Sequence, residues 1–191
     1  MPSGGDGPPR AGALLVATPV IGDPNFERAV VLLLHHDEDG SLGIVLNRPS
    51  ELDVETALPT WSSLATPPGV VHIGGPVGPS GVLALGRAGS DQPVPSRGWA
   101  ELSPGLGAID LSLEPAELGT PLQALRLYAG YAGWGPAQLS GELAAGAWWV
   151  FDALVRDAFS AEPTGLWWEV VRRQGGDFRI YAHAPLDPSV N

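Results

Sequence analysis

The 191-residue sequence has no cysteine and no lysine, and its ten basic residues are all arginine. Without cysteine there is no disulfide framework, thiolate nucleophile or thiolate metal ligand. Without lysine there is no Walker A lysine, Schiff base or lysine general base. These absences exclude whole classes of chemistry before any motif is considered.

Long apolar runs are missing too. The longest, Ala29 to Leu34 and Ala147 to Phe151, are far shorter than the roughly 20 residues of a membrane-spanning helix. Residues 1–10 lack the basic segment and apolar core of a secretory signal. We therefore expect a soluble protein that makes no membrane contact.

Positive charge is scarce, because 21 acidic residues against ten arginines give a net charge of −11. This balance argues against binding of duplex DNA, and no pair of adjacent helices carries basic recognition positions. A hydrophobic content of 44% with seven Trp favours a packed core despite 26 Gly and 20 Pro. The length predicts a single domain, residues 12–183, between flexible tails at 1–11 and 184–191.

Short β-strand patterns dominate the first two thirds. Residues 29–35 are a β-branched and Leu run, Asp37 to Gly40 is turn chemistry, and residues 42–46 return as a partner strand. This pattern predicts an antiparallel hairpin over 29–47. Residues 86–104, with three Pro and three Gly, are expected to form a poorly structured surface excursion. Further strands are predicted at 14–17, 70–73, 81–85, 107–111 and 124–128, and a short helix at 53–58.

Helices are expected mainly in the last third. One is predicted over 136–145, with Pro in its first turn, and a clearer one over 162–174. One or two helical turns near 152–159 and strands at 147–151 and 178–182 complete the prediction. Because strands outnumber helices and do not alternate regularly with them, the predicted fold class is α+β with a mixed, mainly antiparallel sheet.

Two motifs that invite a chemical interpretation are not supported by their spacing. The adjacent His35 and His36 point to opposite faces of a strand and do not converge on one ion, so we assign no metal. Gly78-Pro79-Ser80-Gly81 is not a nucleophile elbow, because its second Gly comes one residue early and a strand follows.

The segment Gly130 to Gly135 is expected to be a turn between a strand and a helix. Two alternatives stay open for it: an anion site at the helix start, or a turn whose glycines let aromatic side chains pack. Two Trp pairs follow, Trp148-Trp149 and Trp167-Trp168. In each pair we expect one indole inside and the other partly exposed.

Four segments, taken in order, resemble the YqgE/AlgH family of bacterial proteins, and the match runs from about residue 13 to 182. In the family a strand ending in Leu-His often follows the third segment; here Val82 to Gly86 stands there, so no histidine role is carried over. The segments are 15–33 with Asp23-Pro24-Asn25-Phe26, 36–49 with Asn47-Arg48-Pro49, Gly74-Gly75-Pro76-Val77, and 130–148 with Gly133-Trp134-Gly135 and Glu142.

The resemblance implies a single α+β domain with a barrel-like mixed sheet surrounded by helices, in a cytoplasmic protein. It implies no known reaction, so we assign no catalytic residue and no cofactor. The family's association with transcriptional regulation suggests a regulatory role.

Polar residues of these segments sit at loops and element ends, where function tends to gather. Arg48 offers a planar fork for a carboxylate or phosphate, and would face Glu142 or the 130–135 turn if the two halves meet. A buried ion pair that fixes the fold is the other interpretation of Arg48. The candidate binding residues are Asn25, Arg28, Asn47, Arg48, Tyr131, Trp134, Gln138 and Glu142.

Three functions remain open. The favoured one is a non-enzymatic regulatory domain that binds a small molecule or a protein. A second is an enzyme, for example a hydrolase, that uses His36 or Asp37. The third is a transcriptional regulator that acts through a protein partner rather than by binding DNA directly.

Overall fold

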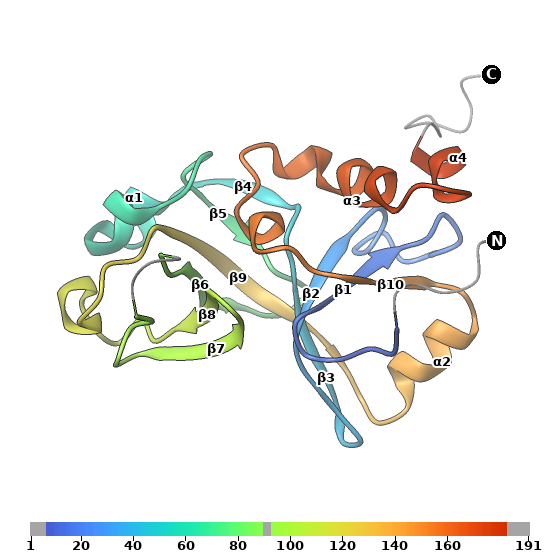
Figure 1. Cartoon of the computed structure of the whole chain (residues 1–191), viewed down its shortest axis with the longest axis horizontal. Coiled ribbons are helices and arrows are strands. Elements are labelled where there is room, and N and C mark those ends of the chain that lie inside the picture. The colour runs from blue at the N-terminus through green and yellow to red at the C-terminus, as the bar shows by residue number, and fades with distance from the viewer. Residues whose placement is uncertain (1–6, 90–92, 183–191) are drawn as a thin grey trace.

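The computed structural model describes residues 7–89 and 93–182. Four helices and four 3₁₀ turns accompany ten strands over these residues (Figure 1). The strands are β1 (Ala13–Ala17), β2 (Val30–Asp37), β3 (Gly40–Val45), β4 (Pro49–Asp53), β5 (Val70–Ile73), β6 (Val77–Arg87), β7 (Trp99–Ser103), β8 (Leu106–Ile109), β9 (Ala124–Trp134) and β10 (Trp148–Asp152). The helical elements are α1 (Val54–Ala57), α2 (Gln138–Ala144), α3 (Leu166–Gln174), α4 (Phe178–Ala182), and the 3₁₀ turns η1 (Pro59–Leu64), η2 (Pro115–Leu118), η3 (Val155–Phe159) and η4 (Pro163–Gly165).

The strands form one curled sheet in the order β10-β1-β2-β3-β9-β6-β8-β7, with β4 and β5 on a side branch. Every pairing between these strands is antiparallel except that of β5 with β9. The predicted fold class is therefore confirmed: a single α+β domain built on a mixed, mainly antiparallel, barrel-like sheet. None of the described helices is long and apolar enough to cross a membrane.

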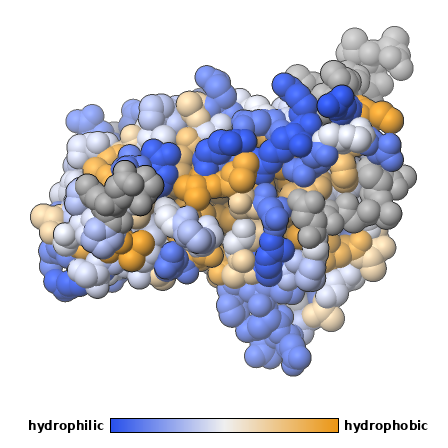
Figure 2. All heavy atoms as spheres, viewed as in Figure 1, coloured by the Kyte–Doolittle hydropathy of each residue, from blue (hydrophilic) through white to orange (hydrophobic). Residues whose placement is uncertain are grey.

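The hairpin predicted over 29–47 is confirmed as β2 and β3, joined by a tight turn, with a bulge between Leu33 and His35. Its far end projects from the body of the molecule (Figure 1) and is hydrophilic (Figure 2). The projection follows from the sequence, because the apolar first half of β2 is buried while the polar stretch from His35 to Gly40 holds no apolar side chain to bury.

Strand β9 lies at the centre of the sheet and is longer than predicted. Its first half pairs with β5 and β6, and it then continues through residues 130–134 to pair with β3. The prediction of a turn at Gly130 to Gly135 is therefore wrong for residues 130–134. Glycine is needed there for a different reason: a Cβ on Gly130, whose φ is +69°, would lie 2.6 Å from the carbonyl oxygen of Gly75.

The sheet buries apolar side chains on both faces. Trp149 and Phe151 join the cluster under α3, whereas Trp148 and Val150 join the cluster on the opposite face. Alternating residues of β10 therefore all find a core, and both Trp148 and Trp149 are buried. The expectation of one partly exposed indole is wrong for this pair and right for the pair on α3, where Trp167 is buried and Trp168 half-buried.

Two further predictions are corrected. Residues 86–104 are not a mere excursion, because β6 runs to Arg87 and β7 occupies Trp99–Ser103; residues 90–92 lie outside the described part. Residues 178–182 form the helix α4 rather than a strand. Phe178 and Tyr181, three residues apart, both reach Trp149, with ring centroids 5.3 and 5.2 Å away. That contact needs a helical period and overrides the local alternation.

The remaining elements agree with the sequence. The helices predicted at 53–58 and 136–145 are present as α1 and α2, and the helix predicted over 162–174 is η4 followed by α3. The strands predicted at 14–17, 70–73, 107–111 and 147–151 are β1, β5, β8 and β10, and η3 supplies the turns expected near 152–159. Strand β6 begins earlier than expected, at Val77. The tails predicted at 1–11 and 184–191 lie mostly outside the described residues.

Candidate ligand-binding cleft

The eight candidate residues fall into two separate groups and a remainder. Arg28, Asn47 and Arg48 line one cavity of about 470 Å³, which we call the arginine cleft. Trp134, Gln138 and Glu142 are not in this lining and belong to a separate hydrogen-bonded group, described below as the indole cluster. The cleft is lined by Pro24, Glu27, Arg28, Asn47, Arg48, Pro49, Thr164 and Trp168.

Asn47 fixes the shape of the cleft. Its side chain is 3% exposed. Its Oδ1 accepts a hydrogen bond from the backbone N–H of Val30 at 2.9 Å, and its Nδ2 donates to the backbone carbonyl of Arg28 at 2.8 Å. The short Asn side chain thus ties the end of β3 to the residues that lead into β2, and satisfies two buried backbone groups at once.

The turn that Asn47 holds places Arg28 in an unusual conformation. The φ of Arg28 is +51°, a left-handed value that costs a non-glycine residue on the order of 1 kcal/mol. Its guanidinium lies over the indole of Trp168, 5.0 Å from the ring centroid, and 5.9 Å from that of Trp167. A cation–π contact of this kind contributes about 0.5–1 kcal/mol and fixes where the charge sits.

Arg48 is the second cation of the cleft, and it is half-buried. Its Nη2 donates to the backbone carbonyl of Glu27. Burial lowers the pKa of Arg48, and the negative charge of Glu27 opposes that shift. A guanidinium remains protonated under such conditions, so Arg48 presents a full positive charge to the cavity.

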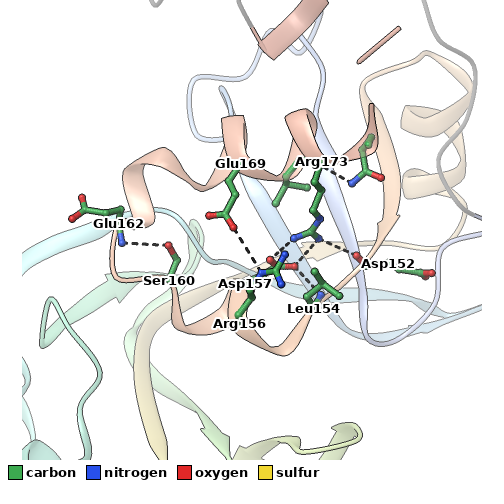
Figure 3. Close-up of polar contacts among 10 residues, drawn as sticks. Asp152, Leu154, Arg156, Asp157, Ser160, Glu162, Glu169 and Arg173 are labelled. Atoms are coloured by element: carbon green, nitrogen blue, oxygen red, sulfur yellow. Dashed lines mark hydrogen bonds and ion pairs between the residues drawn. The ribbon is translucent and has the colours of Figure 1, made fainter. Parts of the chain in front are cut away.

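The opposite wall of the cleft comes from η4 and α3, which supply Thr164 and Trp168. An ion pair anchors α3 on η3 (Figure 3): Arg173 Nη1 and Nη2 lie 2.5 and 2.7 Å from the two carboxylate oxygens of Asp157. Asp157 is 1% exposed and also accepts the backbone N–H of Leu154 at 2.8 Å. The bidentate geometry sets the position of α3, and with it the position of Trp168.

The other group, the indole cluster, consists of Trp134, Gln138, Glu142 and Trp148. Glu142 Oε2 accepts from the indole N–H groups of Trp134 at 2.9 Å and Trp148 at 2.7 Å. Gln138 donates to Glu142 Oε1 at 3.0 Å and accepts the backbone N–H of Gly135 at 3.1 Å. These bonds satisfy both carboxylate oxygens within the protein.

The remaining candidates, Asn25 and Tyr131, belong to neither group. Asn25 is exposed, and both its backbone N–H and its Nδ2 bond to Asp23 Oδ1 within the turn before Arg28. Tyr131 is half-buried in β9, opposite Val77 of β6. The predicted approach of Arg48 to Glu142 is not formed, because Arg48 bonds to Glu27 and Glu142 to the two indoles.

A second cavity of about 470 Å³ lies between the hairpin end and α2. His36 Nδ1 and Ser41 Oγ, both in its lining, are 2.7 Å apart, whereas His35 pairs with Asp37 at 2.7 Å. The hydrogen bond from His35 lowers the pKa of Asp37. Within residues 7–89 and 93–182, no three metal-binding side chains come together.

A third polar group lies inside the sheet, where β5 meets β9. His72 and Arg126 are 0% and 2% exposed. His72 Nδ1 lies 3.2 Å from the carbonyl oxygen of Val70, and Arg126 Nη2 donates to the carbonyl of Pro67. Burial and the charge of Arg126 lower the pKa of His72 to about 4, so His72 is neutral at physiological pH. Sequence reasoning did not select either residue.

Sequence reasoning also missed three lining residues of the arginine cleft: Glu27, Thr164 and Trp168. Trp168 carried a signal, since one member of the Trp167-Trp168 pair was expected to be partly exposed. Thr164 carried none, because it is far from Asn47 and Arg48 in the sequence and joins the cleft only through the fold.

The curled, mainly antiparallel sheet, with a cleft between its strand ends and helix α3, places this protein in a class of small α+β proteins. A family model described as AlgH-like matches residues 14–179. A UPF0301 protein of Streptomyces coelicolor is 50% identical over 185 residues, which cover 94% of each chain. This chain belongs to the AlgH-like family, as its sequence segments indicated.

Solved structures agree with this assignment. A crystal structure of a protein from Corynebacterium diphtheriae matches with a TM-score of 0.88 at 29% identity, covering 96% of this chain and 95% of that one. The solution structure of AlgH from Pseudomonas aeruginosa matches with a TM-score of 0.67 at 28% identity, covering 92% and 94%.

Proposed function

We propose that this protein is a non-enzymatic regulatory domain that acts by binding a ligand in the arginine cleft. One observation carries the proposal: three residues selected from the sequence as binding candidates, Arg28, Asn47 and Arg48, line the same cavity. A volume of about 470 Å³ is within the usual range for small-molecule sites. The acidic balance of the chain argues for action through a ligand or protein partner rather than on DNA. The family membership supports a cytoplasmic location.

The division of the candidate residues supports this reading. The indole cluster uses the polar groups of Glu142 and Gln138 internally, whereas the cleft keeps a cation at its surface. Binding residues must leave donors available to a ligand, and only the cleft meets that requirement among the sites predicted from sequence.

The test is a fragment screen by NMR on the whole chain, with the indole N–H signals as reporters. We expect bound fragments to shift the Trp168 signal and to leave the Trp148 signal in place. Arg48→Ala should remove the shift, and Gln138→Ala, the matched variant in the indole cluster, should retain it. Fragments that shift only Trp148, or binding unchanged in Arg48→Ala, would overturn the proposal.

An enzymatic role is the second candidate, favoured by the 2.7 Å contact between His36 Nδ1 and Ser41 Oγ inside a cavity. A hydroxyl hydrogen-bonded to an imidazole is the minimal arrangement of an activated nucleophile. Turnover of an ester substrate that disappears in both Ser41→Ala and His36→Gln would establish it. Equal residual activity in both variants and the wild type would exclude these residues.

A further inference from the structure

We propose that the arginine cleft recognises an oxyanion, a carboxylate or phosphate group, that is attached to a compact apolar body, with Arg48 as the direct donor. This inference rests on the proposed function and names the chemical class of its ligand. It follows from the charge of the cleft, the donors left at its surface, the fixed position of its cations and the character of its walls.

The first argument is charge. The lining of the cleft includes two of the ten arginines and one carboxylate, Glu27. The chain as a whole carries about two acidic residues for each basic one. The described residues of this lining therefore carry a net positive charge, against the trend of the whole molecule. A local potential of this sign concentrates anions, and it does so most strongly where low-dielectric walls surround it.

The second argument is the state of the donors. Among the described residues, Arg48 makes one hydrogen bond, from Nη2 to the carbonyl of Glu27. Its Nε–H and Nη1–H groups thus remain for a ligand. The Thr164 hydroxyl on the facing wall is exposed and bonds to no other described residue. Guanidinium and hydroxyl donors in the lining of one cavity suit an acceptor with several oxygens.

The third argument is that the site is held in place before any ligand binds. The bond to Glu27 fixes the guanidinium plane of Arg48, and Asn47 and Trp168 hold Arg28 between them. Arg28 occupies a left-handed position that glycine would adopt at lower cost. A strained conformation of this kind persists only where the surrounding structure holds the residue in place. Pre-positioned charges lose little entropy on binding.

The fourth argument concerns the rest of the ligand. Pro24, Pro49 and the indole of Trp168 give the cleft apolar walls beside its charges. A bare inorganic ion would leave those walls in water. A ring or short hydrocarbon bearing the oxyanion would cover them, and burial of that apolar surface favours binding. The cleft thus fits an organic acid or an organic phosphate better than a free ion.

The experiment titrates the whole chain with four probes, followed by NMR at the Trp168 indole: benzoate, phenyl phosphate, benzamide and inorganic phosphate. Benzoate and benzamide share shape and differ in charge. We expect benzoate or phenyl phosphate to bind at least about tenfold more tightly than benzamide, since benzamide lacks the charge that strengthens a hydrogen bond from a guanidinium. Phenyl phosphate should also bind more tightly than inorganic phosphate. Whichever of benzoate and phenyl phosphate binds more tightly shows whether the ligand carries a carboxylate or a phosphate group.

Variants locate the effect. Arg48→Gln should weaken binding of the better acid by about tenfold or more and leave benzamide unchanged, and Arg48→Lys should recover part of the loss. Arg156→Gln is the matched control, because Arg156 is an exposed arginine that pairs with Glu169 of α3 at 3.8 Å. An unaltered folded spectrum of Arg48→Gln shows that the loss is not one of folding.

The possible outcomes test this inference and the proposed function separately. Benzamide bound as tightly as benzoate at the Trp168 indole would overturn the oxyanion class while leaving a ligand-binding cleft. Failure of all four probes, together with failure of the fragment screen, would overturn both. Equal binding of benzoate to wild type and Arg48→Gln would remove Arg48 as the donor.

Discussion

The arginine cleft and the indole cluster both contain residues that the sequence predicts as binding candidates. Each also lies beside a non-glycine residue in the left-handed region, Arg28 at φ +51° for the cleft and Ala137 at φ +59° for the cluster. They differ in how their polar groups are used. Glu142 joins two indoles and Gln138 within the protein. Arg48 joins one backbone carbonyl and presents its remaining donors at a cavity.

The difference shows that polar residues at element ends can serve opposite purposes. A polar group whose hydrogen bonds all close within the chain stabilises and orients its neighbours. A group fixed by one bond and left with spare donors is prepared for a ligand. Hence the two groups should respond differently to substitution: the indole cluster in stability alone, and the arginine cleft in binding.

The largest expected effect concerns the anchor of the cleft wall. Asp157→Asn leaves Arg173 without a carboxylate under α3, and loss of one partner of a buried ion pair costs about 3 kcal/mol or somewhat more. Urea denaturation would measure the loss. Because α3 carries Trp168, binding of benzoate at the cleft should weaken as well.

The control for that variant lies beside it in Figure 3. Arg156→Gln removes the exposed pair with Glu169 and should change the free energy of unfolding by no more than about 0.5 kcal/mol. If Asp157→Asn were as mild as Arg156→Gln, the ion pair would not be the anchor of α3.

A somewhat smaller loss is expected in the indole cluster. Glu142→Ala leaves the indole N–H groups of Trp134 and Trp148 without an acceptor, at a cost of about 2–3 kcal/mol. Glu142→Gln keeps an acceptor and should lose about half as much. Thermal or urea unfolding gives both values, and the affinity of the cleft for benzoate should stay at the wild-type level. A large drop in that affinity would mean that the two groups act as one site.

An element of the fold could be predicted when the interactions that determine it lie within a few residues of the sequence. The β2–β3 hairpin and the α3 helix follow from patterns within a few residues, and both were predicted. The strand character of residues 130–134 was missed because Gly130 is required by its close approach to Gly75, which lies between β5 and β6. Helix α4 was missed because its period is set by contact with Trp149.

The same limit applies to the candidate site. Asn47 and Arg48 were selected because they stand at the end of a strand, and Arg28 because it precedes one. No local sequence pattern shows that these residues share a cavity with Thr164 of η4, or that they are separate from Glu142. A sequence lists polar residues at element ends but does not state whether their partners are in the chain, since hydrogen bonds across the fold decide that.

His72 offers a test on a residue that belongs to neither the arginine cleft nor the indole cluster. A buried imidazole with its pKa lowered from 6.5 to about 4 stays neutral in the folded protein, while the unfolded chain takes up a proton near pH 6.5. Stability from this source is complete above pH 6.5 and decreases as the pH falls toward 4. At no more than about 1.4 kcal/mol per pH unit, the loss between pH 6 and 4.5 is about 2 kcal/mol.

The measurement is urea denaturation across that range for the wild type and for His72→Gln, which has no proton to gain. The variant should lose most of the slope. The window lies above the titration of Asp37 and Asp110, whose pKa values are held below 3.8 by hydrogen bonds. An unchanged slope in His72→Gln would place the pH sensitivity elsewhere in the chain.

The smallest expected effect bears most directly on the two left-handed turns. Ala137→Gly relieves the strain at the start of α2 and should raise stability by up to about 1 kcal/mol, reduced by the greater freedom of glycine in the unfolded chain. Arg28→Gly relieves the same strain but removes the contact with Trp168, worth about 0.5–1 kcal/mol, so its stability should stay near the wild-type value. Thermal unfolding compares the two, and benzoate titration completes the test: Ala137→Gly should bind as the wild type does, and Arg28→Gly should bind more weakly. If Arg28→Gly gained as much stability as Ala137→Gly and kept its affinity, the left-handed arginine would be a feature of the turn alone, and the contrast between the two regions would rest on Arg48.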